Sequence, residues 1–178
     1  VFTCPTVWAQ QKQDTQNQNC AANLQQKSGE IFAIVKWMAD FKAGIDASYS
    51  ICSGTLPKDY AATSHIYTEW QKKTDAEMEQ AYSVIDKVIN DSASASCAPA
   101  VKTVQTDSRV AIERQYKISY DRQIKSAKSF QAMSADQARK SCTGLLKSVT
   151  EYYEDHPDMT DILFTISRTH TKFVHTTN

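Results

Sequence analysis

Five cysteines spread along the chain constrain its fold more than any other feature: Cys4, Cys20, Cys52, Cys97 and Cys142. No two of them have the close spacing of a metal-binding pair, so we expect long-range disulfides. Disulfides persist in oxidising compartments, which predicts a secreted, extracellular protein, with a periplasmic protein as the alternative. The chain also starts at Val1 without a charged and apolar leader, as expected of a mature secreted protein.

Low glycine and proline content favours long helices. The 178 residues include only four Gly and four Pro, and apolar residues recur at helical spacing through most of the chain. We therefore predict an all-α fold, an elongated up-and-down bundle of five to six helices stapled by disulfides. The whole chain, 1–178, is expected to form one domain, made of an N-terminal hairpin (5–52), long helices (59–90 and 98–133) and C-terminal helices (135–155 and 158–175).

Local signals set these predicted boundaries. Ser28-Gly29 is expected to break the hairpin into two helices, and Gly54 is suited to a left-handed helix end. Thr74 begins a capping-box pattern inside the third helix, so a kink or restart there is an open alternative. Ser134 and Gln137 make a second capping box that should open the fifth helix.

Helix lengths give a prediction for the disulfides. Two antiparallel helices of equal length in the hairpin would bring Cys4 beside Cys52 at its open end. Axial position then favours Cys20–Cys142, which leaves Cys97 as a free or intermolecular thiol and a Cys97-linked dimer as one outcome. A kink at Thr74 would instead make Cys20–Cys97 competitive.

Two surface features accompany this framework. Asn90-Asp91-Ser92 is an N-glycosylation acceptor pattern in a polar stretch at a predicted helix end, so Asn90 is a candidate glycan site. Residues 98–147 carry ten Lys and Arg against four Asp and Glu. The sequence thus offers a possible basic contact face, although a solvated helix surface is the more common meaning of such a run: Lys102, Arg109, Lys117, Lys125 and Lys128.

No catalytic pattern is present in the sequence. It has no nucleophile motif, its glycines are isolated, and its carboxylates show no pairing suited to acid–base catalysis. His65 and Glu69 are four residues apart, but a second pair of ligands is missing, so we predict no metal site. We expect a protein that is not an enzyme, requires no cofactor and does not bind nucleic acid. No apolar run approaches the roughly 18 residues of a transmembrane segment.

Aromatic side chains at helical spacing supply one candidate pocket, with an ordinary helix-bundle core as the simpler interpretation: Trp37, Phe41, Tyr67, Trp70 and Tyr82. Two functions remain open. The first is a secreted, non-enzymatic protein that engages a protein or glycan partner through an exposed helix face, either the basic helix or the loop around Asn90–Cys97. The alternative is an extracellular carrier of a hydrophobic small molecule or lipid in a pocket between helices.

Overall fold

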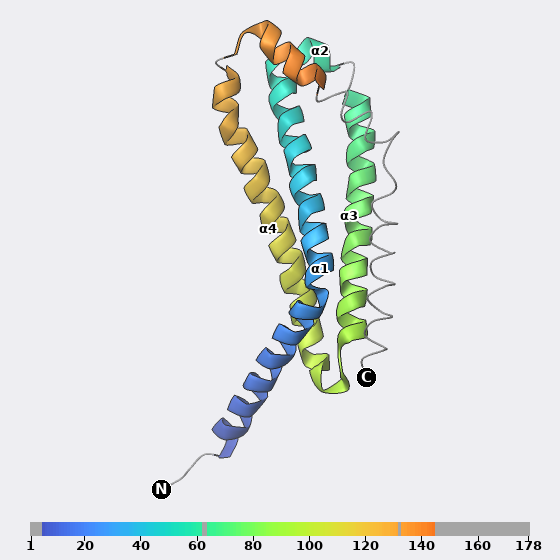
Figure 1. The fold of residues 1–178 in the computed structure, drawn as a ribbon, viewed down its shortest axis with the longest axis vertical. Helices are drawn as coiled ribbons and strands as arrows, with labels where there is room; N and C mark the ends of the chain where they lie inside the picture. Colours follow the sequence, from blue (N-terminus) through green and yellow to red (C-terminus); the bar gives the residue numbers. More distant parts are fainter. Residues whose placement is uncertain (1–4, 62–63, 132, 145–178) are drawn as a thin grey trace.

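A computed structural model describes residues 5–61, 64–131 and 133–144 (Figure 1). Within these residues it contains four labelled α-helices and one short 3-10 helix: α1 (Pro5–Thr55), α2 (Pro57–Ala61), α3 (Ser64–Ser92), η1 (Ala95–Cys97) and α4 (Ala98–Gln131). Residues 135–144 are helical as well. The described part of the chain has no strand, which confirms the all-α prediction. Of the helices in that part, none is long and apolar enough to cross a membrane.

Helix α1 is one continuous element where the sequence predicted a hairpin. It contains 51 residues and, at a rise of 1.5 Å per residue, is about 77 Å long. Ser28 stays inside it because its hydroxyl donates a hydrogen bond to the Leu24 carbonyl over 2.9 Å. Gly29 and Gly54 do not take a positive φ. The predicted break at Ser28-Gly29 and the predicted left-handed helix end at Gly54 are therefore both wrong.

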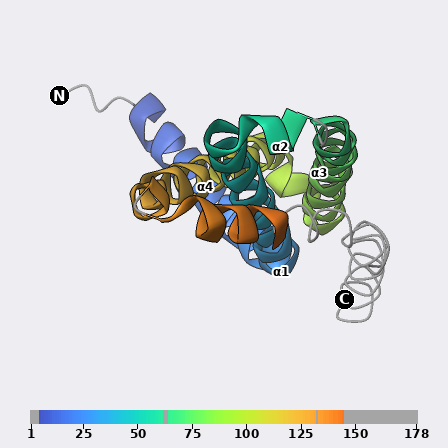
Figure 2. The same cartoon turned by 90° about the horizontal axis from the view of Figure 1, so that it is seen from above.

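Helices α1, α3 and α4 form the body of the protein. The chain runs up through α1, down through α3 and up again through α4 (Figure 1). Viewed along the bundle, α1 lies between α3 and α4 (Figure 2), and it makes most of the contacts between elements. The predicted range 98–133 corresponds closely to α4, whereas the predicted range 59–90 begins within α2 and covers most of α3. Helix α3 continues through Thr74 without a restart and runs straight (Figure 1). The Thr74 hydroxyl donates to the Trp70 carbonyl within the same helix.

The predicted count of five to six helices is not confirmed. One predicted helix disappears because α1 is continuous, and the predicted range 158–175 lies outside the described residues. The capping box that opens the fifth predicted helix, 135–155, is present. The Ser134 backbone amide donates to the Gln137 side chain over 3.1 Å, and the Gln137 amide donates back to the Ser134 hydroxyl over 3.3 Å. Only residues 135–144 of that range are described.

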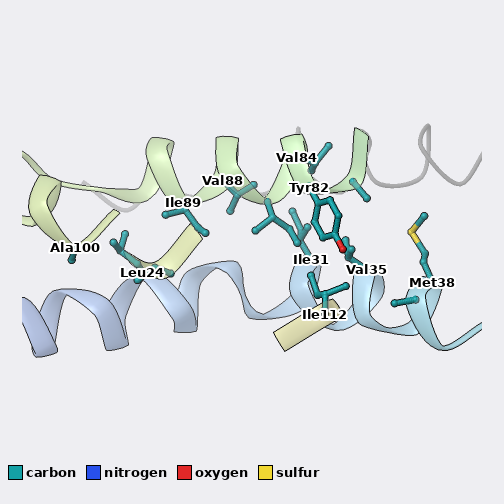
Figure 3. Packing of buried hydrophobic residues seen from close by; sticks show 14 of the residues in the cluster. Leu24, Ile31, Val35, Met38, Tyr82, Val84, Val88, Ile89, Ala100 and Ile112 are labelled. Carbon is teal, nitrogen blue, oxygen red and sulfur yellow. The ribbon is translucent and has the colours of Figure 1, made fainter. Parts of the chain in front are cut away.

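The main apolar core lies where α1 crosses α3 and the first half of α4 (Figure 3). Buried residues recur every three or four positions on each helix, as an amphipathic helix requires. Ile31, Val35, Ile85, Ile89 and Ile112 are each at most 1% exposed. At about 25 cal/mol per Å² of apolar surface, burying one such side chain stabilises the fold by roughly 1.5–3 kcal/mol.

Two disulfides close the bundle, and both differ from the predicted pairs. Cys20 is bonded to Cys97, and Cys52 is bonded to Cys142, with Cα–Cα distances of 5.4 and 5.7 Å. The predicted Cys4–Cys52 and Cys20–Cys142 pairs are wrong because they depended on the hairpin. A continuous α1 separates its first residue, Pro5, from Cys52 by about 70 Å along its axis. Cys20–Cys97, the competing alternative, forms without any kink in α3.

Candidate functional site

A buried carboxylate joins the three long helices above the apolar core. Asp46 of α1 is only 5% exposed. Its Oδ1 accepts a hydrogen bond from the Tyr67 hydroxyl of α3 over 2.7 Å, and its Oδ2 accepts one from the Tyr116 hydroxyl of α4 over 2.6 Å. Because α1, α3 and α4 each contribute one of these side chains, Asp46 fixes how the helices align along one another.

Lys42 provides the compensating charge. Its ammonium group donates to Asp46 Oδ2 over 2.7 Å and lies 3.2 Å from an Asp75 oxygen. The same nitrogen lies 5.3 Å from the Trp70 ring centroid and 5.6 Å from that of Tyr116, within cation–π range. A buried carboxylate needs such a partner, because an unpaired charge in a low-dielectric interior costs several kcal/mol.

This environment keeps two tyrosines protonated. Burial raises the pKa of Tyr67 and that of Tyr116 well above the usual value near 10, and the hydrogen bond to Asp46 raises both further. Both hydroxyls therefore remain hydrogen-bond donors to Asp46 across the physiological pH range. The two tyrosines therefore hold α3 and α4 to the Asp46 carboxylate of α1 through hydrogen bonds.

Aromatic rings extend from this network toward the second disulfide. Tyr67 stacks on Trp70, with ring centroids 5.8 Å apart, and on Tyr49, with centroids 3.6 Å apart. Tyr49 in turn meets Tyr60 edge-on at 5.3 Å. The Tyr60 hydroxyl donates to the Cys142 carbonyl over 2.6 Å, so the stack ends at the Cys52–Cys142 bond.

A hollow of about 430 Å³ opens beside Asp46, between α1, α3 and α4. We call it the tyrosine hollow. The described residues that line it are four tyrosines, two serines, one glutamine and the buried aspartate: Tyr49, Tyr67, Tyr116, Tyr120, Ser50, Ser53, Gln71 and Asp46. Its volume lies within the range of small-molecule sites.

The candidate aromatic pocket of the sequence does not form a single cavity. Trp37 and Phe41 stack at 5.9 Å beside a recess of only about 20 Å³, which is room for one water molecule. Tyr67 lines the tyrosine hollow, and Tyr82 lines a separate hollow of about 370 Å³. Trp70 is completely buried. The sequence identified residues of the aromatic region but grouped them wrongly.

The candidate basic face divides into exposed and structural residues. Lys102, Lys117 and Lys125 are exposed on α4. Arg109 instead points toward α3, where it donates to Asp86 over 2.7 Å and lies 4.9 Å from the Tyr82 ring. The side chain of Lys128 is not among those described. A contact role for the three exposed lysines stays a prediction.

The second hollow region lies at the other end of α1. All but one of residues 10–19 are exposed, and this part of α1 leans away from the bundle (Figure 1). It forms an open groove of about 830 Å³ with the turn between α3 and α4. We call it the amide groove, after the Gln and Asn side chains of its α1 wall: Gln11, Gln16, Asn19 and Asn23. Ser92, Ser94 and Ser96 form the facing wall, and the Cys20–Cys97 bond joins the two.

The disulfide changes the interpretation of Cys97. Cys97 was predicted to be a free or intermolecular thiol, and that prediction is wrong because Cys97 is bonded to Cys20. In this bond the Cys97 sulfur is not free to link a second chain. Cys4, the fifth cysteine of the sequence, lies outside the described residues. Asn90 is exposed near the end of α3, so its position is accessible to modification, and a glycan there stays a prediction.

Sequence reasoning missed the Asp46 network, although one signal was available. Asp46 occupies a position of the buried stripe of α1, between Ala43 and Ala47, with Lys42 four residues earlier. A charged residue at a core position of a helix indicates a buried partner. Within the described residues, no group of three or more His, Cys, Asp and Glu side chains is arranged to hold a metal ion. Comparison with protein-family models, curated proteins and solved structures finds no match.

Proposed function

We propose that this is a secreted, non-enzymatic protein that binds a macromolecular partner, and that the amide groove is its contact surface. The observation that carries the proposal is the exposed N-terminal part of α1. An isolated helix as short as the exposed residues 10–19 of α1, with no buried apolar face, has marginal stability in water. It is stabilised here because it continues a packed helix, so its exposed side chains are held in a fixed arrangement.

The groove suits a hydrogen-bonding partner. Its walls present amide groups on α1 and hydroxyl groups on the α3–α4 turn, and amides supply both donors and acceptors. Among the described residues that line the groove, Lys12 and Lys27 are the only charged ones. The partner that fits best is therefore a protein segment or glycan rich in hydrogen-bonding groups and negatively charged.

Binding to defined arrays of secreted-protein ectodomains and of acidic and neutral glycans tests the proposal. We expect at least one ligand to bind the native protein, and the Asn23→Asp/Lys27→Glu variant to weaken its binding about tenfold, a change of about 1.4 kcal/mol. Both positions are exposed, so the fold should be retained. Lys117→Glu/Lys125→Glu on α4 is the matched charge control. Loss of binding in that control alone would move the contact surface to the basic helix and refute the role of the groove.

A further inference from the structure

We propose that the tyrosine hollow binds a neutral carbohydrate, of about one or two sugar rings. The hollow lies near the Cys52–Cys142 end of α1, whereas the amide groove lies near the Cys20–Cys97 end. The inference is therefore independent of the proposed macromolecular contact, and either can fail without the other.

The shape and lining of the hollow suit a ligand with both apolar and polar surfaces. Aromatic rings come from two sides, the stacked Tyr49 and Tyr67 of α1 and α3 and the stacked Tyr116 and Tyr120 of α4. Tyr49 and Tyr67 cover one face of each other, and Lys42 lies over the Tyr116 ring, so the ring that can stack on a sugar is that of Tyr120, whose one described ring contact is with Tyr116. The face of an aromatic ring carries negative partial charge, so it attracts the weakly positive C–H groups on one face of a sugar ring. Ser50, Ser53 and Gln71 line the same space and can hydrogen-bond the hydroxyl groups at the ring edge.

Asp46 supplies a fixed acceptor at the buried end of the hollow. It is 5% exposed and held by the hydroxyls of Tyr67 and Tyr116. Each carboxylate oxygen can accept two hydrogen bonds. Among the described residues, Oδ1 accepts one, from Tyr67, and so retains capacity for a ligand hydroxyl. A preorganised acceptor in a partly desolvated site contributes more than the same group in water.

Charge balance argues for a neutral ligand. The negative charge of Asp46 is compensated by Lys42, whose ammonium lies 2.7 Å from it. No other ionisable acid or cation lines the hollow among the described residues. A cationic ligand would gain little attraction there, and an anion would meet an already paired carboxylate.

The lining also argues against a lipid. None of the described residues that line the hollow has an aliphatic side chain. An acyl chain would leave the carboxylate, the amide and the serine hydroxyls without their water partners, at a cost for each buried polar group. A hydrophobic carrier would need a lining of Leu, Ile and Val, which this chain instead uses in its closed core.

Saturation-transfer NMR on the purified, disulfide-bonded protein tests the inference, with glucose, galactose, mannose, N-acetylglucosamine and trehalose as probes. Each is used at about 10 mM, enough to populate a site with a Kd of about 1 mM. We expect at least one sugar to bind and Tyr120→Ala to raise its Kd about tenfold, as loss of one stacking ring predicts. Tyr120 is half-buried and makes no bond to Asp46 among the described contacts, so its removal should leave the network intact.

Two further variants make the result decisive. Ser50→Leu, at an exposed position of α1, should block the hollow with an apolar side chain and abolish binding without disturbing the core. Trp37→Ala removes an exposed aromatic ring that does not line the hollow and should leave the Kd unchanged within twofold. Absence of binding by every sugar, or binding that survives both Tyr120→Ala and Ser50→Leu, would overturn the inference. So would binding of tetramethylammonium or decanoate in place of the sugars.

Discussion

Replacing Asp46 with alanine should destabilise the protein by about 3–5 kcal/mol, the usual cost of removing one partner of a buried ion pair. The structure explains why the cost is high. Asp46 accepts hydrogen bonds from Tyr67, Tyr116 and Lys42, and hydrogen bonds to charged groups contribute about 1.5–3 kcal/mol each without being additive. Lys42, whose side chain is 12% exposed, would keep only the exposed Asp75 as a carboxylate partner within the described part of the chain.

A matched control exists in the same chain. Asp91 also pairs with a lysine four residues earlier on a helix, Lys87, over 2.6 Å. That pair is exposed, so Asp91→Ala should change the free energy of unfolding by at most about 0.5 kcal/mol. The two substitutions remove the same side chain and the same charge, and they differ in burial and in the tyrosine hydrogen bonds.

Urea unfolding at neutral pH with the disulfides intact measures both variants, with tryptophan fluorescence as the signal and linear extrapolation to water. The double variant Lys42→Met/Asp46→Leu completes the test. It removes both charges together, so it should be less destabilised than Asp46→Ala. We expect its total loss in free energy of unfolding to be about 1–2 kcal/mol. Equal losses for Asp46→Ala and Asp91→Ala would refute the argument that the buried network stabilises the bundle.

Three other predictions follow from single features of the structure. Gly29→Ala should stabilise the protein by about 0.5–1 kcal/mol, seen as a higher Tm, because Gly29 lies inside a continuous helix and an added Cβ would have nothing within 4 Å. A destabilised variant would indicate a helix break there. Non-reducing peptide mapping should recover Cys20–Cys97 and Cys52–Cys142, and removing the second bond, which spans 90 residues, should cost about 4–5 kcal/mol. Any peptide that links Cys4 to Cys52 would contradict this connectivity. The raised pKa values of Tyr67 and Tyr116 mean that the folded protein retains these protons above pH 10, where the unfolded chain releases them. Their stabilising contribution is therefore complete below about pH 10 and is lost as pH rises toward the folded-state pKa values. Phenolate absorbance should show tyrosines that titrate well above pH 10 in the native protein, and the Tyr67→Phe/Tyr116→Phe variant should lack them.

The sequence predicted helices better than it predicted contacts between them. Periodicity and capping patterns located α3, α4 and the Ser134–Gln137 box, because these signals are local. The Ser28-Gly29 break was wrong because a propensity cost of about 1 kcal/mol at glycine is smaller than the burial of the flanking apolar residues. Leu24 and Ile31, on either side, are each 1% exposed. That one error changed the disulfide pairing, since both predicted bonds required a turn at this point.

The polar network determines how α1, α3 and α4 are aligned along one another, which the apolar core alone leaves open. Apolar stripes repeated every three to four residues can slide by one helical turn and still bury similar surfaces. The Cys20–Cys97 bond fixes one end of the bundle and Cys52–Cys142 fixes the other. Between them, Asp46 reaches the hydroxyls of Tyr67 and Tyr116 in one alignment of the three helices only, so the network selects that alignment. The same hydrogen bonds orient the tyrosine rings that form the hollow. Lys42→Met/Asp46→Leu should therefore lose ligand binding by more than its modest loss of stability would explain, which separates the role of the network in shaping the hollow from its role in folding.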